Sequence, residues 1–508
     1  MARIYPSIFI NKSKSSTDCH GISMTLIKKV ILNIVKPLTY ICNLSFQTGC
    51  FPRKMKIAKV IPLFKNDNKH AFTNYRPISL LPQFSKILEK LFNSRLEKFL
   101  EKHHAINDGQ YGFRSKRTTS MAINEAIEEV TNALEQKKYA VGIFINLKKA
   151  FDTINHSILL KKMERYGIRG LAGYWLKSYF TGRSQFVKMG QYLSDTLGIV
   201  CGVPQGSVLG PKLFNVYIND MFNTSKVLKF ILFADDTNIF YSSDDYNELV
   251  NTVNRELKII KKWMDTNKLS LNINKTKVMM FGNCNKMSEQ KISIDGIQIE
   301  IVSEIKFLGV IIDSKLSWKP HVRYIKTKIS KSLSIINKAK LYLDENALRT
   351  LYCTLVLPYL TFCVEVWGNT YQNTINPLII LQKRALRIIH KVGFLEHTHN
   401  LFMQSKLLKF DDLVKYNTSI VLYKAFNKLL PPNLQRFFKT PVRAHNLRGF
   451  GHFSLPRAQT TRKYYCVSVC GVKLWNKLDL QQKQCQTIHQ FKLLYKHWVW
   501  LKYRDEGI

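Results

Sequence analysis

The most evident deficit in this 508-residue sequence is of acidic residues. Lysine and arginine number 77 against 35 aspartates and glutamates, which gives a formal net charge of +42 at pH 7. This excess is far larger than solubility requires, so it predicts a polyanionic partner, most simply a nucleic acid, bound in a salt-dependent manner. A membrane surface is the weaker interpretation, because the basic residues are spread along the whole chain and do not gather on one amphipathic helix.

Long apolar runs and paired cysteines are also missing. The longest apolar candidate, residues 24–46, is interrupted by lysines, so we expect no membrane-spanning helix, and the N-terminus has no clear signal peptide. Of the scattered cysteines only Cys466 and Cys470 are close, and no His/Cys cluster with zinc-ligand spacing follows them. We therefore expect an intracellular protein, nuclear or cytoplasmic, with reduced thiols.

Helical and strand-like segments alternate through the first 320 residues. Apolar residues recur at helical spacing in residues 83–102, 121–136 and 247–264, and a further helix is expected to begin at Ala150. Strand-like patterns cover residues 139–147, 228–241, 271–281 and 305–312. This mixture indicates an α+β fold. Beyond Pro320 the pattern becomes helical and basic.

Two adjacent aspartates, Asp235 and Asp236, interrupt the apolar segment 230–240. The flanking residues predict two strands, with residues 234–236 at the turn between them. Neighbouring carboxylates repel each other and are costly beside an apolar sheet unless a cation is bound. A hard divalent cation such as Mg²⁺ prefers carboxylate oxygens and keeps coordination sites open for substrate phosphates. A solvated turn is the alternative for an isolated Asp-Asp pair, but the rest of the chain favours the metal site.

Seven short motifs follow one another in a characteristic order. They are Asn-Tyr-Arg-Pro-Ile-Ser-Leu (74–80), Tyr-Gly-Phe-Arg (111–114), Asn-Leu-Lys-Lys-Ala-Phe-Asp (146–152), Gly-Val-Pro-Gln-Gly-Ser-Val-Leu-Gly-Pro (202–211), Phe-Ala-Asp-Asp-Thr (233–237), Asn-Lys-Thr-Lys (274–277) and Phe-Leu-Gly (307–309). As an ordered set they resemble the reverse transcriptases of non-LTR (LINE-type) retrotransposons, most like the jockey group. Later segments, at residues 357–359, 367–368 and 474–476, resemble the C-terminal region of the same elements.

The resemblance implies a right-hand polymerase with fingers, a palm built on a ferredoxin-like sheet, and a helical thumb. On this basis we expect an N-terminal segment in residues 1–44 and the reverse transcriptase domain, with fingers and palm, in residues 45–314. A helical thumb-like region is expected in residues 315–395. A basic, aromatic and mostly helical C-terminal region is expected in residues 396–508.

The resemblance also implies the chemistry of an RNA-directed DNA polymerase, which is a nucleotidyltransferase. Such an enzyme extends a DNA primer on an RNA template with deoxynucleoside triphosphates, using two Mg²⁺ ions, which Mn²⁺ can replace. Of the family's three metal-binding carboxylates, two match Asp235 and Asp236. Lys275 lies in the motif where a lysine protonates the leaving pyrophosphate, and Lys277 is an equal alternative for that role.

Nucleotide contacts are implied for five further residues. Lys65 and Arg76 match fingers residues that hold the triphosphate, and Phe151 matches the aromatic residue that blocks a ribose 2′-hydroxyl. Gln205 and Gly206 belong to the segment beneath the templating base and the incoming nucleotide, where Ser207 can cap the following helix. The structural alternatives are solvated charges, a core phenylalanine and a plain capping turn.

The third carboxylate of the family pattern is replaced by Asn146 in this chain. An asparagine offers a neutral carbonyl oxygen where the site needs an anionic ligand, so cation binding and catalysis are expected to be impaired. Asp152 is the nearby residue that could supply the missing carboxylate, but the family has an aspartate there in addition to the metal ligand. We interpret Asn146 as a decayed position in a transposon copy.

Two other functions use the same basic surfaces without a working metal site. One is a catalytically inactive nucleic-acid-binding relic with polymerase architecture, and the other is a maturase-like RNA chaperone. The endonuclease of complete elements has no counterpart in the sequence, so target cutting is expected to need a separate protein. No membrane partner is expected.

Overall fold

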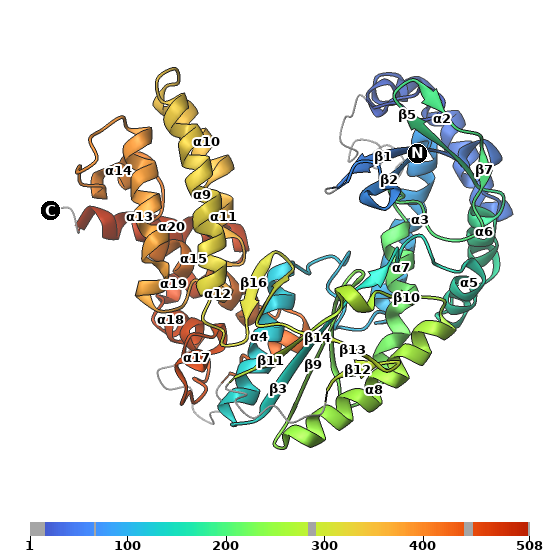
Figure 1. Cartoon of the computed structure of the whole chain (residues 1–508). Coiled ribbons are helices and arrows are strands. Elements are labelled where there is room, and N and C mark those ends of the chain that lie inside the picture. Colours follow the sequence, from blue (N-terminus) through green and yellow to red (C-terminus); the bar gives the residue numbers. More distant parts are fainter. Residues whose placement is uncertain (1–15, 66–67, 283–290, 441–450, 506–508) are drawn as a thin grey trace.

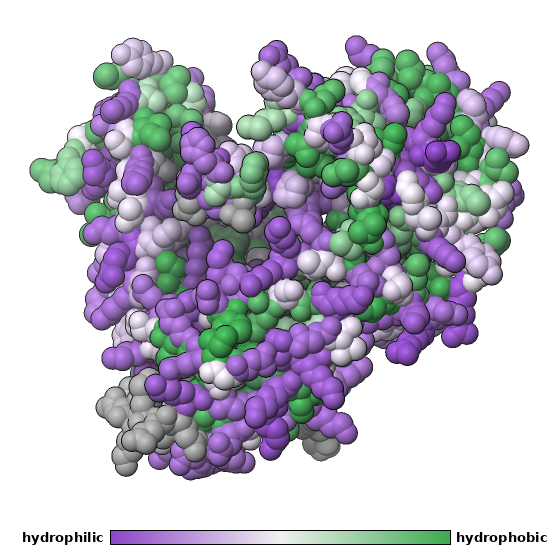
Figure 2. All heavy atoms as spheres, turned by 45° about the vertical axis from the view of Figure 1, so that its right-hand side comes forward, coloured by the Kyte–Doolittle hydropathy of each residue, from purple (hydrophilic) through white to green (hydrophobic). Residues whose placement is uncertain are grey.

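The computed structural model describes residues 16–65, 68–282, 291–440 and 451–505, so residues 1–15 of the expected N-terminal segment lie outside the described residues. The described chain forms two arms that rise from a common base (Figure 1). Elements from the N-terminal half form one arm, helices from the C-terminal half form the other, and a central sheet lies at the base (Figure 1). A space-filling view, turned by 45° from that of Figure 1, shows a hollow between the two arms (Figure 2).

The central sheet has five strands in the order β14-β11-β3-β9-β8. Their bounds are Glu300–Ile301 (β14), Lys277–Phe281 (β11), Tyr139–Ile145 (β3), Asp236–Ser243 (β9) and Lys229–Phe233 (β8), and all pairings except β11 with β14 are antiparallel. Side chains along β3 alternate between two cores, as strand geometry requires. Ala140 and Phe144 face helix α4 (Thr119–Glu135), whereas Val141 and Ile143 face the helix α8 (Tyr246–Thr266) side. The α+β prediction is confirmed.

The N-terminal arm is built on a hairpin of β1 (Ile57–Phe64) and β2 (Tyr75–Leu80). Strand β1 also pairs in parallel with β5 (Ser184–Met189), which pairs with the short strands β6 (Tyr192–Leu193) and β7 (Leu197–Gly198). The helices of this arm are α2 (Met24–Thr48), α3 (Gln83–Lys102), α5 (His156–Arg165), α6 (Gly170–Phe180) and α7 (Gly210–Ile218). Helix α3 has the bounds that the apolar periodicity predicts. The described helices include none that is both long and apolar enough to cross a membrane.

The helical C-terminal arm follows a hairpin of β15 (Glu304–Phe307) and β16 (Val310–Asp313). Its helices are α9 (Lys319–Ala339), α10 (Glu345–Leu355), α11 (Leu357–Thr361), α12 (Val364–Trp367), α13 (Gln372–Ile389), α14 (His399–Gln404), α15 (Phe410–Phe426), α16 (Pro432–Gln435), α17 (Thr461–Tyr464), α18 (Val472–Asn476), α19 (Leu480–Lys483) and α20 (Ile488–Asp505). Buried apolar residues of α9 to α16, α18 and α20 share one core with the α4 face of the sheet. The C-terminal arm is therefore packed continuously onto the base.

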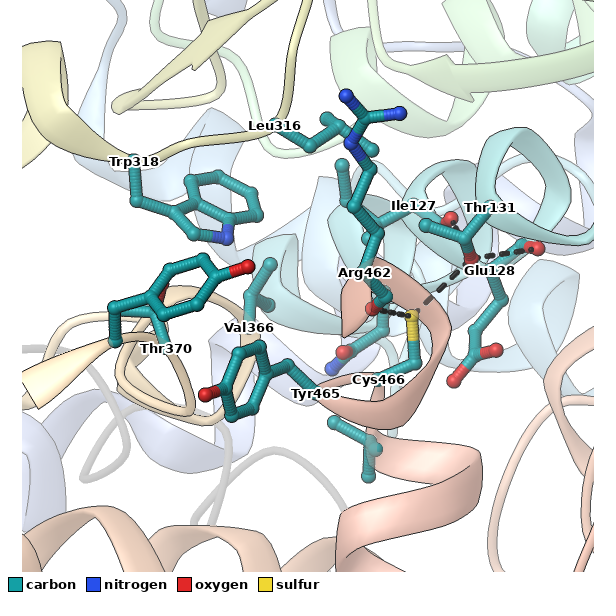
Figure 3. Close-up of a pocket in the computed structure, with 13 residues that line it drawn as sticks. Ile127, Glu128, Thr131, Leu316, Trp318, Val366, Thr370, Arg462, Tyr465 and Cys466 are labelled. Carbon is teal, nitrogen blue, oxygen red and sulfur yellow. Dashed lines mark hydrogen bonds between the residues drawn. The ribbon is translucent and has the colours of Figure 1, made fainter. Parts of the chain in front are cut away.

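Helix α4 also holds the C-terminal region through buried polar contacts. The Lys463 ammonium donates to Glu128 at 2.7 Å and to Ser468 Oγ at 3.0 Å, and the Ser468 N–H donates to Glu128 at 2.8 Å. Close by, Thr131 Oγ1 and Cys466 Sγ lie 3.1 Å apart at a small cavity (Figure 3). None of the sequence-predicted site residues lines this cavity.

One predicted helix start is wrong. Helix α5 begins at His156, not at Ala150, and residues 150–153 form a turn instead. Lys149 adopts φ +49°, which a helix does not accommodate, and the Asn155 side chain caps the later start by accepting the Ile158 N–H at 3.0 Å. The apolar pattern alone does not reveal this break.

Candidate active site

The two aspartates lie at a tight turn between β8 and β9. Because Phe233 pairs with Asp236, the turn consists of Ala234 and Asp235, and Asp236 is already the first residue of β9. Ala234 has φ +58° while Asp235 has a negative φ, which matches a two-residue hairpin turn of type II′. Both aspartates are exposed, although Ala234 and Thr237 on either side are buried. The turn therefore presents two adjacent carboxylates to solvent from an apolar sheet.

Asn146 directly follows β3 at the same edge of the sheet. The β3–β9 pairing ends with Ile145 and Thr237, so Asn146 directly follows this last pair on one strand and Asp236 directly precedes it on the other. The Asn146 N–H donates to Thr276 Oγ1 at 3.3 Å, and its carbonyl accepts the Asn272 N–H at 2.8 Å. Beyond Asn146 the chain leaves the central sheet, since β4 (Leu147–Lys148) pairs with β10 (Ser270–Leu271). The motifs 146–152, 233–237 and 274–277 thus meet at one sheet edge.

The surroundings of the aspartates disfavour two negative charges. Although water reaches both side chains, partial burial raises the pKa of Asp236 to about 6, and the neighbouring Asp235 adds to this increase. Burial also raises the pKa of Asp235, while a hydrogen bond from its own backbone and the charge of Arg76 act in the opposite direction. A bound cation would remove this cost, because it favours the ionised form of both groups.

Arg76 and Lys65 belong to the β1–β2 hairpin of the N-terminal arm. Arg76 pairs with Leu63, and the Lys65 N–H donates to the Asn74 carbonyl at 2.9 Å, so strand alternation puts Lys65 and Arg76 on one face of the hairpin. Both basic side chains are exposed. The positive charge of Arg76 favours the ionised form of Asp235 and so opposes the increase in its pKa.

The segment containing Gln205 and Gly206 contacts β2 on one side and the turn that carries Asp152 on the other. The Gln205 carbonyl accepts the Ser79 N–H at 2.8 Å, and the Gln205 amide donates to both carboxylate oxygens of Asp152, at 2.9 and 3.1 Å. Gly206 has φ +131°, and a Cβ at this position would lie 2.5 Å from the Ser79 carbonyl oxygen, so only glycine fits. Ser207 accepts the N–H of Gly210, the first residue of α7, at 2.9 Å, although the N-cap position itself is Leu209.

Phe151 and the two candidate lysines have different surroundings. The half-buried Phe151 ring stacks on Phe214 with a centroid distance of 4.7 Å and contacts Phe113 edge-on at 6.3 Å. Lys275 is exposed, whereas Lys277 forms an ion pair with Glu300. Of these two lysines, Lys275 is the one without an ion pair among the described residues.

Sequence reasoning missed two buried polar residues that support the site. Glu89, on α3, is fully buried and accepts the N–H groups of Val208 at 2.7 Å and Leu209 at 3.3 Å, at the beginning of α7. Gln110 is equally buried and accepts the Ala234 N–H at 3.1 Å. The only signal for Glu89 was a charged residue within the apolar stripe of a helix, and Gln110 had none beyond its place before Tyr111.

Comparisons with known proteins indicate the same family as the ordered motifs. Residues 65–312 match the family described as reverse transcriptase (RNA-dependent DNA polymerase). The RNA-directed DNA polymerase from mobile element jockey of Drosophila melanogaster is 30% identical over 390 residues, which are 74% of this chain and 42% of that protein. The probable RNA-directed DNA polymerase from transposon BS of the same species is 26% identical over 426 residues, or 80% of this chain and 46% of that protein.

This chain spans less than half the length of these two relatives. A solved structure of apo telomerase from Candida tropicalis superposes with a TM-score of 0.41 at 12% identity, covering 78% of this chain and 72% of the telomerase chain. The family match in residues 65–312 contains all seven ordered motifs completely. Residues 65–312 therefore form a reverse transcriptase (RNA-dependent DNA polymerase) domain, and the chain is homologous to the RNA-directed DNA polymerases of jockey-like non-LTR retrotransposons.

Proposed function

We propose that this chain is an RNA-directed DNA polymerase whose divalent-metal site is incomplete at Asn146. The observation that supports the proposal is the register of β3 and β9, whose last pair, Ile145 with Thr237, adjoins Asn146 on one strand and Asp236 on the other. A carboxylate at position 146 would give three anionic ligands at one sheet edge. An asparagine leaves two.

The chemistry of the donor groups supports a weakened metal site. Asp235 and Asp236 supply the anionic oxygens that Mg²⁺ or Mn²⁺ prefers, and Asn146 adds one neutral oxygen. The described parts of the chain contain no group of three or more His, Cys, Asp or Glu side chains placed to hold a metal ion. When bound, the divalent ions would activate the primer 3′-hydroxyl and stabilise the charge of an in-line displacement.

The chain's own residues would bind and orient the nucleotide. Lys65 and Arg76 would neutralise the triphosphate from the fingers hairpin, where the planar guanidinium of Arg76 suits phosphate oxygens. Gln205 and Gly206 would support the templating base and the incoming nucleotide. Lys275 would donate a proton to the leaving pyrophosphate.

Phe151 would select deoxynucleotides by blocking a ribose 2′-hydroxyl. Its ring is held on Phe214 and is only half-buried, so one side can contact a sugar. An RNA template and a DNA primer would occupy the hollow between the arms, with the N-terminal arm as fingers and residues 315–395 as the thumb.

Asp152 does not replace the missing ligand in this proposal. Both of its carboxylate oxygens accept hydrogen bonds from Gln205, so turning toward the aspartate turn would break these bonds and displace the Gln205 segment. The lost anionic ligand then costs about three decades in rate, or about 4 kcal/mol of transition-state stabilisation.

A non-catalytic nucleic-acid-binding protein is the second candidate function, and Asn146 is the observation that favours it. Binding to an RNA template needs only the basic surfaces, which the net charge of +42 supplies without any metal. The two functions make different predictions for a repaired site. A repaired polymerase extends primers, whereas a relic with further defects binds nucleic acid and does not.

The experiment is primer extension on an RNA template by the Asn146→Asp variant with Mg²⁺. We expect incorporation that follows the template sequence and disappears when Asp235→Asn is added to the same variant. Asn33→Asp, on the exposed surface of α2, makes the same chemical change away from the site and should not raise extension. If Asn146→Asp binds RNA–DNA duplex yet adds no nucleotide with Mg²⁺ or Mn²⁺, the non-catalytic function is the correct one.

A further inference from the structure

We infer that Gln110 is a positioning residue that fixes the aspartate turn from the fingers side, an inference that rests on the proposed function. The loop between α3 and α4 runs beside β8 and bonds to it. Its Tyr111 N–H donates to the Leu232 carbonyl at 2.7 Å, and the Leu232 N–H donates to the Gly109 carbonyl at 2.8 Å. This loop therefore forms a short parallel pairing with the strand that leads into the turn.

The Gln110 side chain continues this pairing up to the turn itself. Its Oε1 atom accepts the Gly112 N–H at 2.8 Å and the Ala234 N–H at 3.1 Å. Because both neighbours are backbone donors, the amide oxygen and not the nitrogen must face them. Gln110 is fully buried, so water does not compete for these two hydrogen bonds.

The bond to Ala234 matters because of the conformation of that residue. Ala234 adopts φ +58°, which a residue with a Cβ rarely adopts, so the surrounding structure must stabilise it. Ala234 immediately precedes Asp235, and its orientation sets the direction of the following carboxylates. An acceptor on the Ala234 N–H therefore holds the aspartate pair through the backbone.

The loop that carries Gln110 is itself held in place. A Cβ on Gly112 would lie 2.2 Å from the Ala234 nitrogen, so the two backbones are in direct contact. The Asn215 amide, on α7, donates to the Gly112 carbonyl at 2.8 Å. Tyr111 also bonds to Glu125 on α4. Gln110 thus connects the aspartate turn to a loop that is held by several contacts, and it does not touch the reacting atoms.

The first test measures order at the turn and needs no catalytic activity. Gln110→Met keeps the side-chain length but removes the acceptor, whereas Gln110→Glu keeps an oxygen at the same reach. Gln382→Met is the matched control, because Gln382 is also buried and hydrogen-bonded, to Tyr352 and the Leu408 carbonyl in the C-terminal arm. We expect hydrogen exchange in the peptide 230–240 to accelerate about tenfold in Gln110→Met, as for the loss of one buried hydrogen bond, and to stay unchanged in Gln382→Met.

The second test measures the consequence for the metal site in the Asn146→Asp background. We expect Gln110→Met to weaken Mn²⁺ binding, followed by electron paramagnetic resonance, by about tenfold and to lower the single-turnover rate by about ten- to a hundredfold. The Kd for template–primer should change less than about twofold, because Gln110 is buried and offers no phosphate contact. Gln110→Glu should retain most of the Mn²⁺ affinity and most of the single-turnover rate.

The outcomes separate this inference from the proposed function. Unchanged exchange at residues 230–240 in Gln110→Met overturns the positioning role, and so does an equal acceleration in the Gln382→Met control. If exchange accelerates as expected while the Asn146→Asp parent neither binds Mn²⁺ nor extends primers, the proposed function fails and the support of the turn by Gln110 stands.

Discussion

The Gln205 amide donates to both carboxylate oxygens of Asp152, at 2.9 and 3.1 Å, across 53 residues of sequence. This contact ties the segment beneath the proposed nucleotide site to the turn that follows Asn146. It depends on Asp152 being an acceptor and Gln205 a donor. Replacing the donor by an acceptor, or the acceptor by a donor, should break the hydrogen bonds between Gln205 and Asp152.

Gln205→Glu tests this dependence directly. Two carboxylates would then face each other within hydrogen-bond distance, so we expect the free energy of unfolding at pH 7 to fall by about 1–2 kcal/mol. Adding Asp152→Asn to that variant supplies a donor again and should recover most of the loss. Urea unfolding of the single and double variants measures both effects, and additive losses in the double variant would show that the contact is not energetically coupled.

Binding to RNA–DNA duplex should be tight at low salt and should weaken by about a thousandfold or more between 50 and 200 mM salt. The cause is the release of counterions by many lysine and arginine contacts. Sequence preference should be weak, since polymerases hold the backbone and not base edges. Fluorescence anisotropy with two duplexes of permuted sequence checks both statements, and a Kd independent of salt would count against a nucleic-acid groove.

The buried pair of Lys463 and Glu128 should be essential for keeping the C-terminal region on the base. Their side chains are 5% and 3% exposed, so Lys463→Met would leave an unpaired carboxylate in the interior. We expect that variant to lose about 3–5 kcal/mol of unfolding free energy. The double variant Lys463→Met/Glu128→Met should lose much less, because both charges are removed together. A double variant no more stable than the single one would contradict this reasoning.

Stability at mildly acidic pH should depend on His321, at the junction of α9 with the β15–β16 hairpin. Its Nδ1 accepts the Ile311 N–H at 3.2 Å, and burial, reinforced by Lys306, lowers the pKa of His321 to about 4. The unfolded chain binds this proton near pH 6.5 while the folded chain does not. The contribution of neutral His321 to the free energy of unfolding should therefore be fully present above pH 6.5. It should fall by up to about 3 kcal/mol as the pH drops to 4.

The variant His321→Asn isolates this contribution, because it keeps a side-chain acceptor near the position of Nδ1 and does not titrate in this range. As the pH falls from 6.5 to 4, the unmodified protein should lose unfolding free energy relative to His321→Asn. A difference that is constant over this interval would mean that the pKa of His321 is the same in the folded and the unfolded protein.

Local patterns in the sequence predicted the elements better than the contacts between them. The apolar spacing of residues 83–102 is a local property, and helix α3 has these bounds. The start of α5 escaped prediction because the backbone reversal at Lys149 leaves no trace in the apolar pattern. Strand β3 ends at Ile145 because the next residues pair with β10, a choice made by tertiary structure.

The supports of the site could not be predicted for the same reason. Glu89 meets Val208 across 119 residues, and Gln110 meets Ala234 across 124 residues. Each bond joins a side chain to a backbone group, so no complementary residue type marks the partner in the sequence. The residues with proposed roles in chemistry were found through ordered motifs, and their roles stay predictions.

The rate of a single nucleotide addition on an RNA template, measured with Mg²⁺ at saturating template–primer for the unmodified protein and for Asn146→Asp, tests the central claim most directly. The substitution places a carboxylate at the sheet edge that carries the aspartate turn, at nearly unchanged volume, so packing should not confound the comparison. The incomplete metal site predicts a rate near background for the unmodified protein and an increase of about two decades or more for Asn146→Asp. Equal, efficient extension by both proteins would contradict the claim and would make Asp152 the first residue to examine as the third ligand.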